Sequence, residues 1–274
     1  MEGREVSANG GIMQQGSLEW LKWRHEGIGA SDTAALLGLD IYGKTPRTLY
    51  LDKTAPMAEA SQDTAEHLRA GHEIESMVRA MHEFDTGEDF PPACFEHPEY
   101  PFIRASLDGW SDKLKEPIEI KMVAQAAMGT PVPPHHMVQC QKELLVTGAS
   151  AMTYIRHCRS TAQTEKIRIS EDRTIQRDIL AADWKFWDAV QRRTAPDYID
   201  ADWVPSDDPA LMVGVDDWKA AQTTKDKKNA RGWLLSAVDR PRTLCGGVKI
   251  QRAPFTERVS LVKVGVAGET EDAE

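Results

Sequence analysis

Three residues with side chains suited to phosphodiester chemistry stand close together near the middle of the chain. Asp108 is followed eleven residues later by Glu119, and Lys121 comes two residues after Glu119. Two carboxylates, together with the backbone carbonyl of Ile120, form an all-oxygen site suited to Mg²⁺, with Mn²⁺ as a substitute. A lysine beside such a site can orient a water held by the metal, or help to deprotonate it, for attack on phosphorus. The spacing therefore indicates metal-dependent phosphodiester hydrolysis.

Two neighbouring strands are needed to bring these residues together. The segments 101–108 and 117–123 are predicted to be strands separated by a polar turn. In the second strand, apolar residues alternate with Glu119 and Lys121, so the two charged side chains share one face. An antiparallel pairing would place the carboxylate of Asp108 beside Glu119. The same pattern also fits a surface hairpin with an ordinary Glu–Lys pair.

A long amphipathic helix over residues 63–84 is expected to supply a third carboxylate. At about 100° per residue, Glu75 falls on the apolar stripe of this helix, whereas Glu73 falls on the opposite side. An inward acid has a natural role at the metal site. The alternative is a salt-bridged acid at the edge of the stripe.

A second helix, predicted over residues 135–147, offers a glutamine to the same site. Gln141 lies on the apolar side with Leu144, whereas Gln139 points away by the same phase. An inward glutamine can hydrogen-bond the attacking water or a phosphate oxygen. A buried glutamine satisfied by the backbone is the alternative.

The chain organisation predicts one large domain with an appendage. Residues 1–16, rich in Gly, Ser and Gln, are expected to be disordered, and residues 17–203 to form the domain that holds the acids. The composition changes after Pro196, and residues 204–274 are predicted to be a linker with a small C-terminal appendage.

The composition excludes several classes of protein. No apolar run approaches the roughly 20 residues of a membrane helix, and the first residues lack the apolar core of a secretory signal. The four cysteines form no CxxC pair, which argues against a zinc ribbon or a disulfide framework. We expect reduced thiols in a cytoplasmic protein. The net charge of −10 argues against broad nucleic-acid binding, although a DNA channel needs only a local basic lining.

Five stretches together resemble the YqaJ-type viral recombinases, the family of the lambda phage exonuclease within the PD-(D/E)XK nucleases. They occur in the family's order between residues 18 and 195. The resemblance implies an α/β restriction-endonuclease-like core, with a central mixed sheet flanked by helices. The stretches are WRHEGIGASDTAALLG (23–38), GHEIESMVRAMHEFDTG (71–87), RASLDGW (104–110), IEIKM (118–122) and VQCQKELLVTGAS (138–150).

The resemblance also implies roles for particular residues. The family's metal acids fall on Glu75, Asp108 and Glu119, and its lysine on Lys121. Its QxQ pattern matches both Gln139 and Gln141, and does not choose between them. In the family an arginine ahead of a serine holds the 5′-phosphate of DNA, and these correspond to Arg24 and Ser31. A helix N-terminus and an arginine fork suit a phosphate, although Asp32 lies close by.

The resemblance implies a function as well. The family digests one strand of duplex DNA from its 5′ end and leaves a 3′ single strand for a single-strand annealing protein. The lambda-type enzyme is a ring trimer, and the setting is phage or prophage recombination in a bacterial host. An endonuclease of the same fold, a non-catalytic DNA-binding module and an unrelated structural protein are the alternatives. Resistance of a closed plasmid to cleavage separates the first of these from an exonuclease.

Overall fold

The computed structural model of this chain describes residues 3–5, 7–8, 11–57 and 62–262; side chains are described from residue 74 onward in the helix that begins at residue 62. The chain divides into two compact units, Met1–Pro196 and Asp197–Glu274. The predicted boundary at residues 203/204 falls within the second unit. Over the described residues, no helix is both long and apolar enough to cross a membrane.

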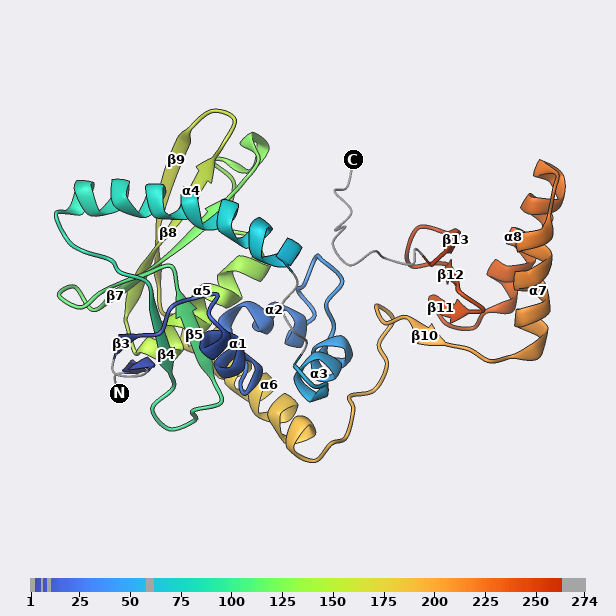
Figure 1. Cartoon of the computed structure of the whole chain (residues 1–274), viewed down its shortest axis with the longest axis horizontal. Coiled ribbons are helices and arrows are strands. Elements are labelled where there is room, and N and C mark those ends of the chain that lie inside the picture. Colours follow the sequence, from blue (N-terminus) through green and yellow to red (C-terminus); the bar gives the residue numbers. More distant parts are fainter. Residues whose placement is uncertain (1–2, 6, 9–10, 58–61, 263–274) are drawn as a thin grey trace. The chain divides into compact units, whose positions relative to one another are not determined.

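The described residues of the first unit form two sheets of more than two strands, where one central sheet was expected (Figure 1). The larger sheet has the order β6-β7-β8-β9 and is mixed, because β7 and β8 run parallel while the outer pairs are antiparallel. The smaller sheet has the order β1-β4-β5. Its strands and those of the larger sheet are β1 (Arg4–Glu5), β4 (Ala93–Glu96), β5 (Arg104–Leu107), β6 (Gly109–Ser111), β7 (Glu116–Met122), β8 (Ala151–Cys158) and β9 (Gln163–Ser170).

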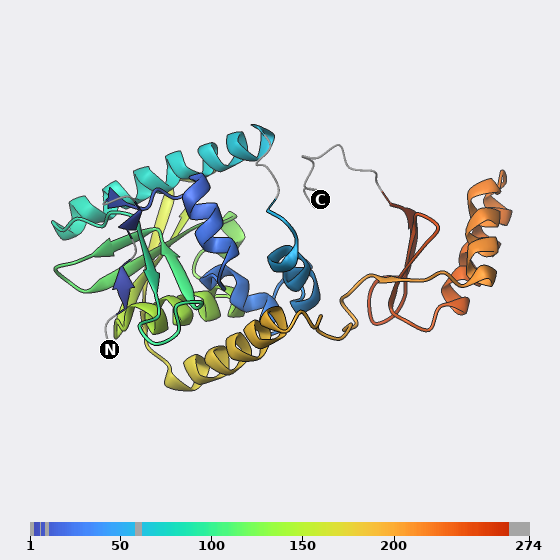
Figure 2. The same cartoon turned by 60° about the horizontal axis from the view of Figure 1, so that its bottom comes forward.

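Helices cover both sides of these sheets. Figure 2 shows α4 along one side of the sheets of the first unit and α6 along the other. The helices of this unit are α1 (Leu18–His25), α2 (Thr33–Leu36), α3 (Pro46–Thr54), α4 (Gln62–Thr86), α5 (Pro134–Thr147) and α6 (Arg173–Gln191).

The crossover between β7 and β8 determines where α5 lies. Parallel strands cannot be joined by a tight turn, so the chain must cross the sheet between them. Helix α5 makes this crossing. It begins with Pro134 in its first turn and ends at Gly148, whose φ of +74° is readily adopted by glycine. The crossover therefore lays α5 against the sheet, in contact with β7 and β8.

The predicted alternation along β7 is confirmed by its packing. Ile118 and Ile120 are buried with Val78 of α4 and with Ile155 of β8. Successive side chains of a strand point to opposite faces. Glu119 and Lys121 therefore face away from this apolar cluster.

Helices α5 and α6 are joined by a buried ion pair. The ammonium of Lys142 lies 2.9 Å from a carboxylate oxygen of Asp183, and both side chains are fully buried. Removing one partner would leave the other charge uncompensated in the interior. The pair thus holds α5 against α6.

The prediction that residues 1–16 are disordered is wrong for the part of this segment that the structure describes. Strand β1 pairs with β4, and β2 (Ser7–Ala8) pairs with β3 (Gly11–Ile12). Met13 is buried, and the Gln15 side chain donates to the carbonyl of Leu107. Backbone pairing does not depend on apolar side chains, so a Gly- and Ser-rich composition did not reveal it.

The second unit is a four-stranded sheet with two helices, where a linker was expected over its first part. Helices α7 (Pro209–Ala220) and α8 (Thr224–Ala237) pack on this sheet around a core of their own. Asp208 and Thr223 cap the two helices by accepting backbone N–H bonds. The strands, in sheet order, are β10 (Val204–Pro205), β11 (Arg242–Cys245), β12 (Val248–Gln251) and β13 (Arg258–Leu261).

Candidate active site

Asp108 stands at the break between β5 and β6, where the chain passes from one sheet to the other. Strand β6 pairs with β7 through Gly109 opposite Ile118. One further step of this antiparallel register places Asp108 opposite Glu119. The backbone N–H of Ile120 donates to Oδ2 of Asp108 over 2.7 Å. The structure thus brings the two acids together as the strand pattern predicted.

Glu119 is almost completely buried, with 1% of its surface exposed. Its Oε1 lies 2.5 Å from Nζ of Lys121 and accepts a hydrogen bond of 2.6 Å from Nε2 of Gln139. Its Oε2 is buried and has no hydrogen-bond partner among the described residues. Burial of an ionisable oxygen without a partner is costly, so this atom is suited to hold a cation.

Glu75 reaches the same region through Arg79. The guanidinium of Arg79 lies 3.4 Å from the Glu75 carboxylate and donates to the carbonyl of Asp108 over 2.7 Å. Glu75 also contributes to the raised pKa of Asp108, so its charge acts on that site. The side chain of Glu73 lies outside the described residues, which leaves the predicted contrast between the two acids a prediction.

The helical phase assigned to α5 is wrong for its two glutamines. Gln139, expected to point away, donates to Glu119. Gln141 is buried on another side, where Nε2 donates to the carbonyl of Ser170 and Oε1 accepts from the N–H of Asp172. Helix α5 is buried around most of its circumference, so its apolar stripe did not identify the side that faces the acids.

Glu143 is a further acid at this place, and the sequence analysis missed it. It is fully buried, and its Oε1 accepts a hydrogen bond of 3.0 Å from Nε2 of Gln139. Its Oε2 has no hydrogen-bond partner among the described residues. The signal available in the sequence was the i, i+4 spacing from Gln139, which places both on one side of the helix.

Burial, and then the crowding of acids, determines the electrostatics of this group. Burial, the Glu119 carboxylate and the Glu75 carboxylate raise the pKa of Asp108 well above its ordinary value. Burial and the same Glu119 charge raise the pKa of Glu143. Burial alone would lower the pKa of Lys121, but Glu119 and Asp108 outweigh it and raise that pKa. Lys121 therefore remains protonated. A further cation bound beside these acids would offset the repulsion between their carboxylates.

The donor set fits a small divalent cation. Mg²⁺ is usually held by one or two carboxylates together with waters and substrate phosphates. Asp108 and Glu119 supply two carboxylates, and the unpartnered Oε2 of Glu119 is an available donor. Among the described residues, no three His, Cys, Asp or Glu side chains form a ready metal-binding group. The structure thus brings together Asp108 and Glu119, with the Ile120 carbonyl as a further candidate, and the role of Glu75 as a third metal acid stays a prediction.

Arg24 and Ser31 also lie together, as the resemblance implied. The guanidinium of Arg24 donates to Oγ of Ser31 over 2.8 Å. The neighbouring Asp32 is buried between two lysines, with Lys44 at 3.0 Å and Lys53 at 3.2 Å. Burial opposes ionisation of Asp32, but these lysines and Arg24 hold its pKa below the ordinary value. Lys44 and Lys53 therefore balance the negative charge of Asp32. The positive charge of Arg24 stays available to a phosphate.

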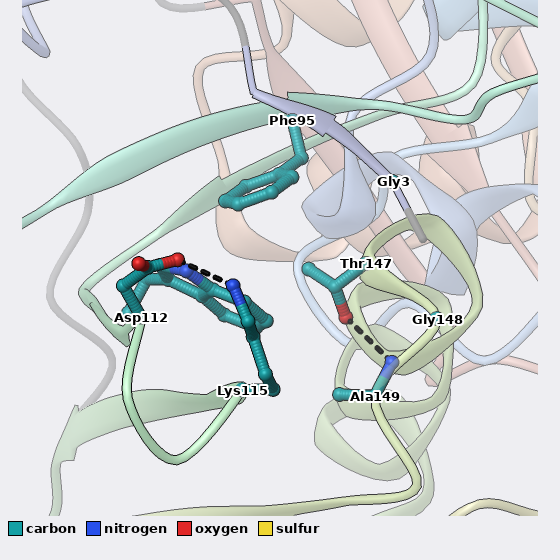
Figure 3. A pocket seen from close by; sticks show the side chains of 8 residues that line it. Gly3, Phe95, Asp112, Lys115, Thr147, Gly148 and Ala149 are labelled. Carbon is teal, nitrogen blue, oxygen red and sulfur yellow. Dashed lines mark hydrogen bonds and ion pairs between the residues drawn. The ribbon is translucent and has the colours of Figure 1, made fainter. Parts of the chain in front are cut away.

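A separate hollow of about 170 Å³ lies away from the acids. Figure 3 shows Phe95 on one side of it, with Asp112, Lys115 and Thr147 around it. Its charged groups are an exposed pair three residues apart, with Lys115 at 2.6 Å from Asp112. None of the acids described above lines it, so it does not belong to the candidate active site.

Comparison with known proteins finds a family model that part of the chain matches. Residues 19–150 match the model of the YqaJ-like viral recombinase domain. One curated relative, the uncharacterized protein YqaJ of Bacillus subtilis (strain 168), is 34% identical over 138 residues. This match covers 47% of the chain and 42% of the relative, so the chain matches less than half of that protein's length.

Solved structures share the fold. The alkaline exonuclease LHK-Exo from Laribacter hongkongensis superposes with a TM-score of 0.53 at 21% identity, over 65% of this chain and 94% of that one. A structure of LHK-Exo in complex with dAMP gives a TM-score of 0.54 at the same identity and coverage. The chain therefore has an α/β fold like that of an alkaline exonuclease.

Proposed function

Because residues 19–150 form a YqaJ-like viral recombinase domain, we propose that this protein is a metal-dependent deoxyribonuclease. It hydrolyses phosphodiester bonds of one strand of linear duplex DNA, with Mg²⁺ as the cofactor and Mn²⁺ as a substitute. The single observation that carries the proposal is that neighbouring strands bring Asp108 and Glu119 together. Lys121 forms an ion pair with Glu119, and Oε2 of Glu119 is buried without a hydrogen-bond partner among the described residues.

Asp108, Glu119 and the carbonyl of Ile120 would hold the cation, with Glu75 close enough to add negative charge. When bound, Mg²⁺ supplies Lewis-acid neutralisation of charge on the scissile phosphate. Lys121, protonated beside Glu119, stabilises negative charge on a phosphate oxygen and orients the attacking water. We assign Gln139, rather than Gln141, as the glutamine of the site. Of the two, Gln139 donates to the proposed metal ligand Glu119, whereas Gln141 donates to a backbone carbonyl.

The proposed substrate end is a 5′-phosphorylated duplex terminus. Arg24 and Ser31 offer a guanidinium and a hydroxyl that already lie within hydrogen-bonding distance of each other. Gly29 precedes Ser31 by two residues, and a side chain added there would contact the guanidinium of Arg24, whereas the space beside Gly27 is filled by Arg104. A phosphate placed here would accept from both groups, and a charged acceptor strengthens such bonds.

The polarity of digestion, the partner protein and the assembly are proposed from the resemblance to the YqaJ-type viral recombinases. We propose 5′→3′ digestion that leaves 3′ single-stranded tails, a single-strand annealing protein as partner and a ring trimer as the assembly. The setting is phage or prophage recombination in the bacterial cytoplasm. LHK-Exo was crystallised with dAMP, which supports a DNA nucleotide as the class of ligand.

One assay tests the proposal directly. Linear duplex DNA labelled at either 5′ end or either 3′ end is incubated with the full chain, with Mg²⁺ or with EDTA. We expect Mg²⁺-dependent release of mononucleotides, with the 5′ label lost first. No hydrolysis with Mg²⁺ or Mn²⁺ would refute the proposal.

A closed circular plasmid is the matched control substrate. An exonuclease leaves it intact until a restriction enzyme opens it, whereas an endonuclease cuts both forms. Cleavage of the closed plasmid would replace the exonuclease with an endonuclease of the same fold. Early loss of the 3′ label would keep the exonuclease and reverse its polarity.

A further inference from the structure

Glu143 is a buried acid with no cation paired to it among the ion pairs of the described residues. It lies on α5, in the crossover that faces β7, and none of its surface is exposed. One of its oxygens accepts from Gln139, and the other has no partner among the described residues. A carboxyl in such a place is costly to bury, so its presence calls for a reason beyond packing.

The carboxamide of Gln139 supplies that reason. Its single nitrogen donates to Oε1 of Glu119 over 2.6 Å and to Oε1 of Glu143 over 3.0 Å. A carboxamide nitrogen carries two hydrogens, so both donors are used by the two acids. The nitrogen end is therefore held between two acceptors, whereas the oxygen end accepts no hydrogen bond from the described residues.

Orientation matters because the two ends of a carboxamide have opposite hydrogen-bonding roles. With Glu119 as its only neighbour, the group is held by one bond and can turn about its last torsion, which is broad for Gln. A second acceptor on the same nitrogen opposes that rotation. Glu143 lies four residues after Gln139, which places the two on one side of α5.

We infer that Glu143 is a positioning residue that fixes the carboxamide of Gln139 with its nitrogen on Glu119 and its oxygen available to the attacking water. The inference deepens the proposed nuclease function and rests on it for its kinetic readout. Glu143 acts through Gln139 in this scheme. It does not need its negative charge, because a neutral carbonyl oxygen can accept the same bond.

The kinetic test uses the full chain and two substitutions of similar size. Glu143→Gln retains a carbonyl oxygen that accepts from Gln139, and we expect kcat close to that of the unaltered protein. Glu143→Met removes the acceptor, and we expect kcat to fall by up to roughly 100-fold with little change in KM, the scale of a misplaced catalytic group. Unchanged kcat in Glu143→Met, or equal losses in both variants, would overturn the inference. Should Glu143→Met fail to fold, Glu143→Ala takes its place.

A double-mutant cycle separates positioning from a general loss of structure. In a Gln139→Ala background there is no carboxamide to hold, so Glu143→Met should cause no further loss of kcat. Losses that add fully would overturn the inference. Thr147→Val is the structural control, since it removes a buried hydroxyl, one turn after Glu143 in α5, that donates to the backbone carbonyl of Glu143. It should lower the melting temperature and leave kcat unchanged.

A readout without DNA cleavage makes the inference independent of the proposed activity. In ¹⁵N NMR spectra, the side-chain amide of Gln139 is identified by its loss in Gln139→Ala. We expect this amide to exchange slowly with water, in Glu143→Gln as in the unaltered chain, and to exchange rapidly in Glu143→Met. If no DNA is hydrolysed but this pattern holds, the nuclease proposal fails and the positioning contact stands. If the amide exchanges equally in all forms, the positioning contact fails.

Discussion

The backbone N–H of Ile120 donates to Oδ2 of Asp108 over 2.7 Å. This bond ties the carboxylate at the strand break to the residue between Glu119 and Lys121. Asp108 is therefore oriented by backbone, which does not depend on the rotamer of any neighbouring side chain.

The first prediction concerns the three central residues. Asp108→Ala and Glu119→Ala should abolish hydrolysis, because each removes a proposed ligand of the cation. Lys121→Ala should lose roughly 100-fold or more, the scale of a positioned catalytic group. Initial rates on linear duplex with Mg²⁺ measure these effects, and circular dichroism checks the fold.

Asp112→Ala is the matched control for Asp108→Ala. Its side chain is 86% exposed and forms an ion pair with Lys115, so removing it should cost little stability or rate. Full activity in any of the three central variants, with folding intact, would refute its assignment.

The second prediction separates the two glutamines of α5. Gln139→Ala should lower kcat, because Gln139 contacts the acids Glu119 and Glu143. Gln141→Ala should instead lower the free energy of unfolding by about 1–3 kcal/mol, because it leaves the buried N–H of Asp172 and carbonyl of Ser170 without their partner. Urea unfolding and initial rates are measured for both variants. A loss of kcat confined to the Gln141 variant would restore the assignment made from helical phase.

The third prediction concerns the 5′ end of the substrate. A charge-assisted arginine contact is typically worth about 1.5–3 kcal/mol, or roughly 10- to 150-fold. Arg24→Ala should slow digestion of 5′-phosphorylated duplex by about that factor and hardly affect 5′-hydroxyl duplex. Ser31→Ala should act in the same direction with a smaller effect.

Matched duplexes that differ only in the 5′ phosphate provide the measurement. Equal rates of the unaltered protein on both would contradict recognition of the phosphate. A preference that persists in Arg24→Ala would assign recognition to other residues.

The fourth prediction is a pH dependence that involves neither DNA nor metal. Lys53, Lys44 and Arg24 overcome burial and depress the pKa of Asp32 below its ordinary value of 3.8. A depressed carboxyl pKa contributes stability that is fully present above the ordinary value and is lost as pH falls through the folded-state pKa. Asp32→Asn should therefore cost about 3–5 kcal/mol at neutral pH, the cost of breaking a buried pair.

Urea unfolding of both proteins across the pH range tests the sign. The difference in the free energy of unfolding between the unaltered protein and Asp32→Asn should stay nearly constant above a pH of about 4 and become smaller below it. A difference that widens in acid would show that the carboxylate of Asp32 is not stabilised by these lysines.

The strand that carries the acids was predictable because its pattern is local. Along β7 the apolar side chains bury on one face, and Glu119 and Lys121 share the other, as strand geometry requires. Asp108 followed from the same rule, since antiparallel register continues one step past the paired residues. Strands β4 and β6, only four and three residues long, have too little alternation to be distinguished from turns.

Helix α5 could not be oriented from sequence, because its neighbours are fixed only by the tertiary fold. A helix with one buried face shows that face as an apolar stripe. Helix α5 is packed against the sheet on one side and joined to α6 by the Lys142–Asp183 pair on another. The sides to which polar residues such as Gln139, Gln141 and Glu143 point then depend on partners that are distant in sequence. The periodicity of the helix does not reveal those partners.

The crossover through α5 also determines when the site can exist during synthesis. Strand β7 is complete at Met122, but its parallel partner β8 ends only at Cys158, and Gln139 arrives with the helix between them. Pairing across such a connection is non-local and follows loop closure. A ribosome-bound chain that stops before β8 emerges therefore carries all the acids without the scaffold that aligns them. For the proposed nuclease activity, a chain that ends before β8 should therefore be inactive.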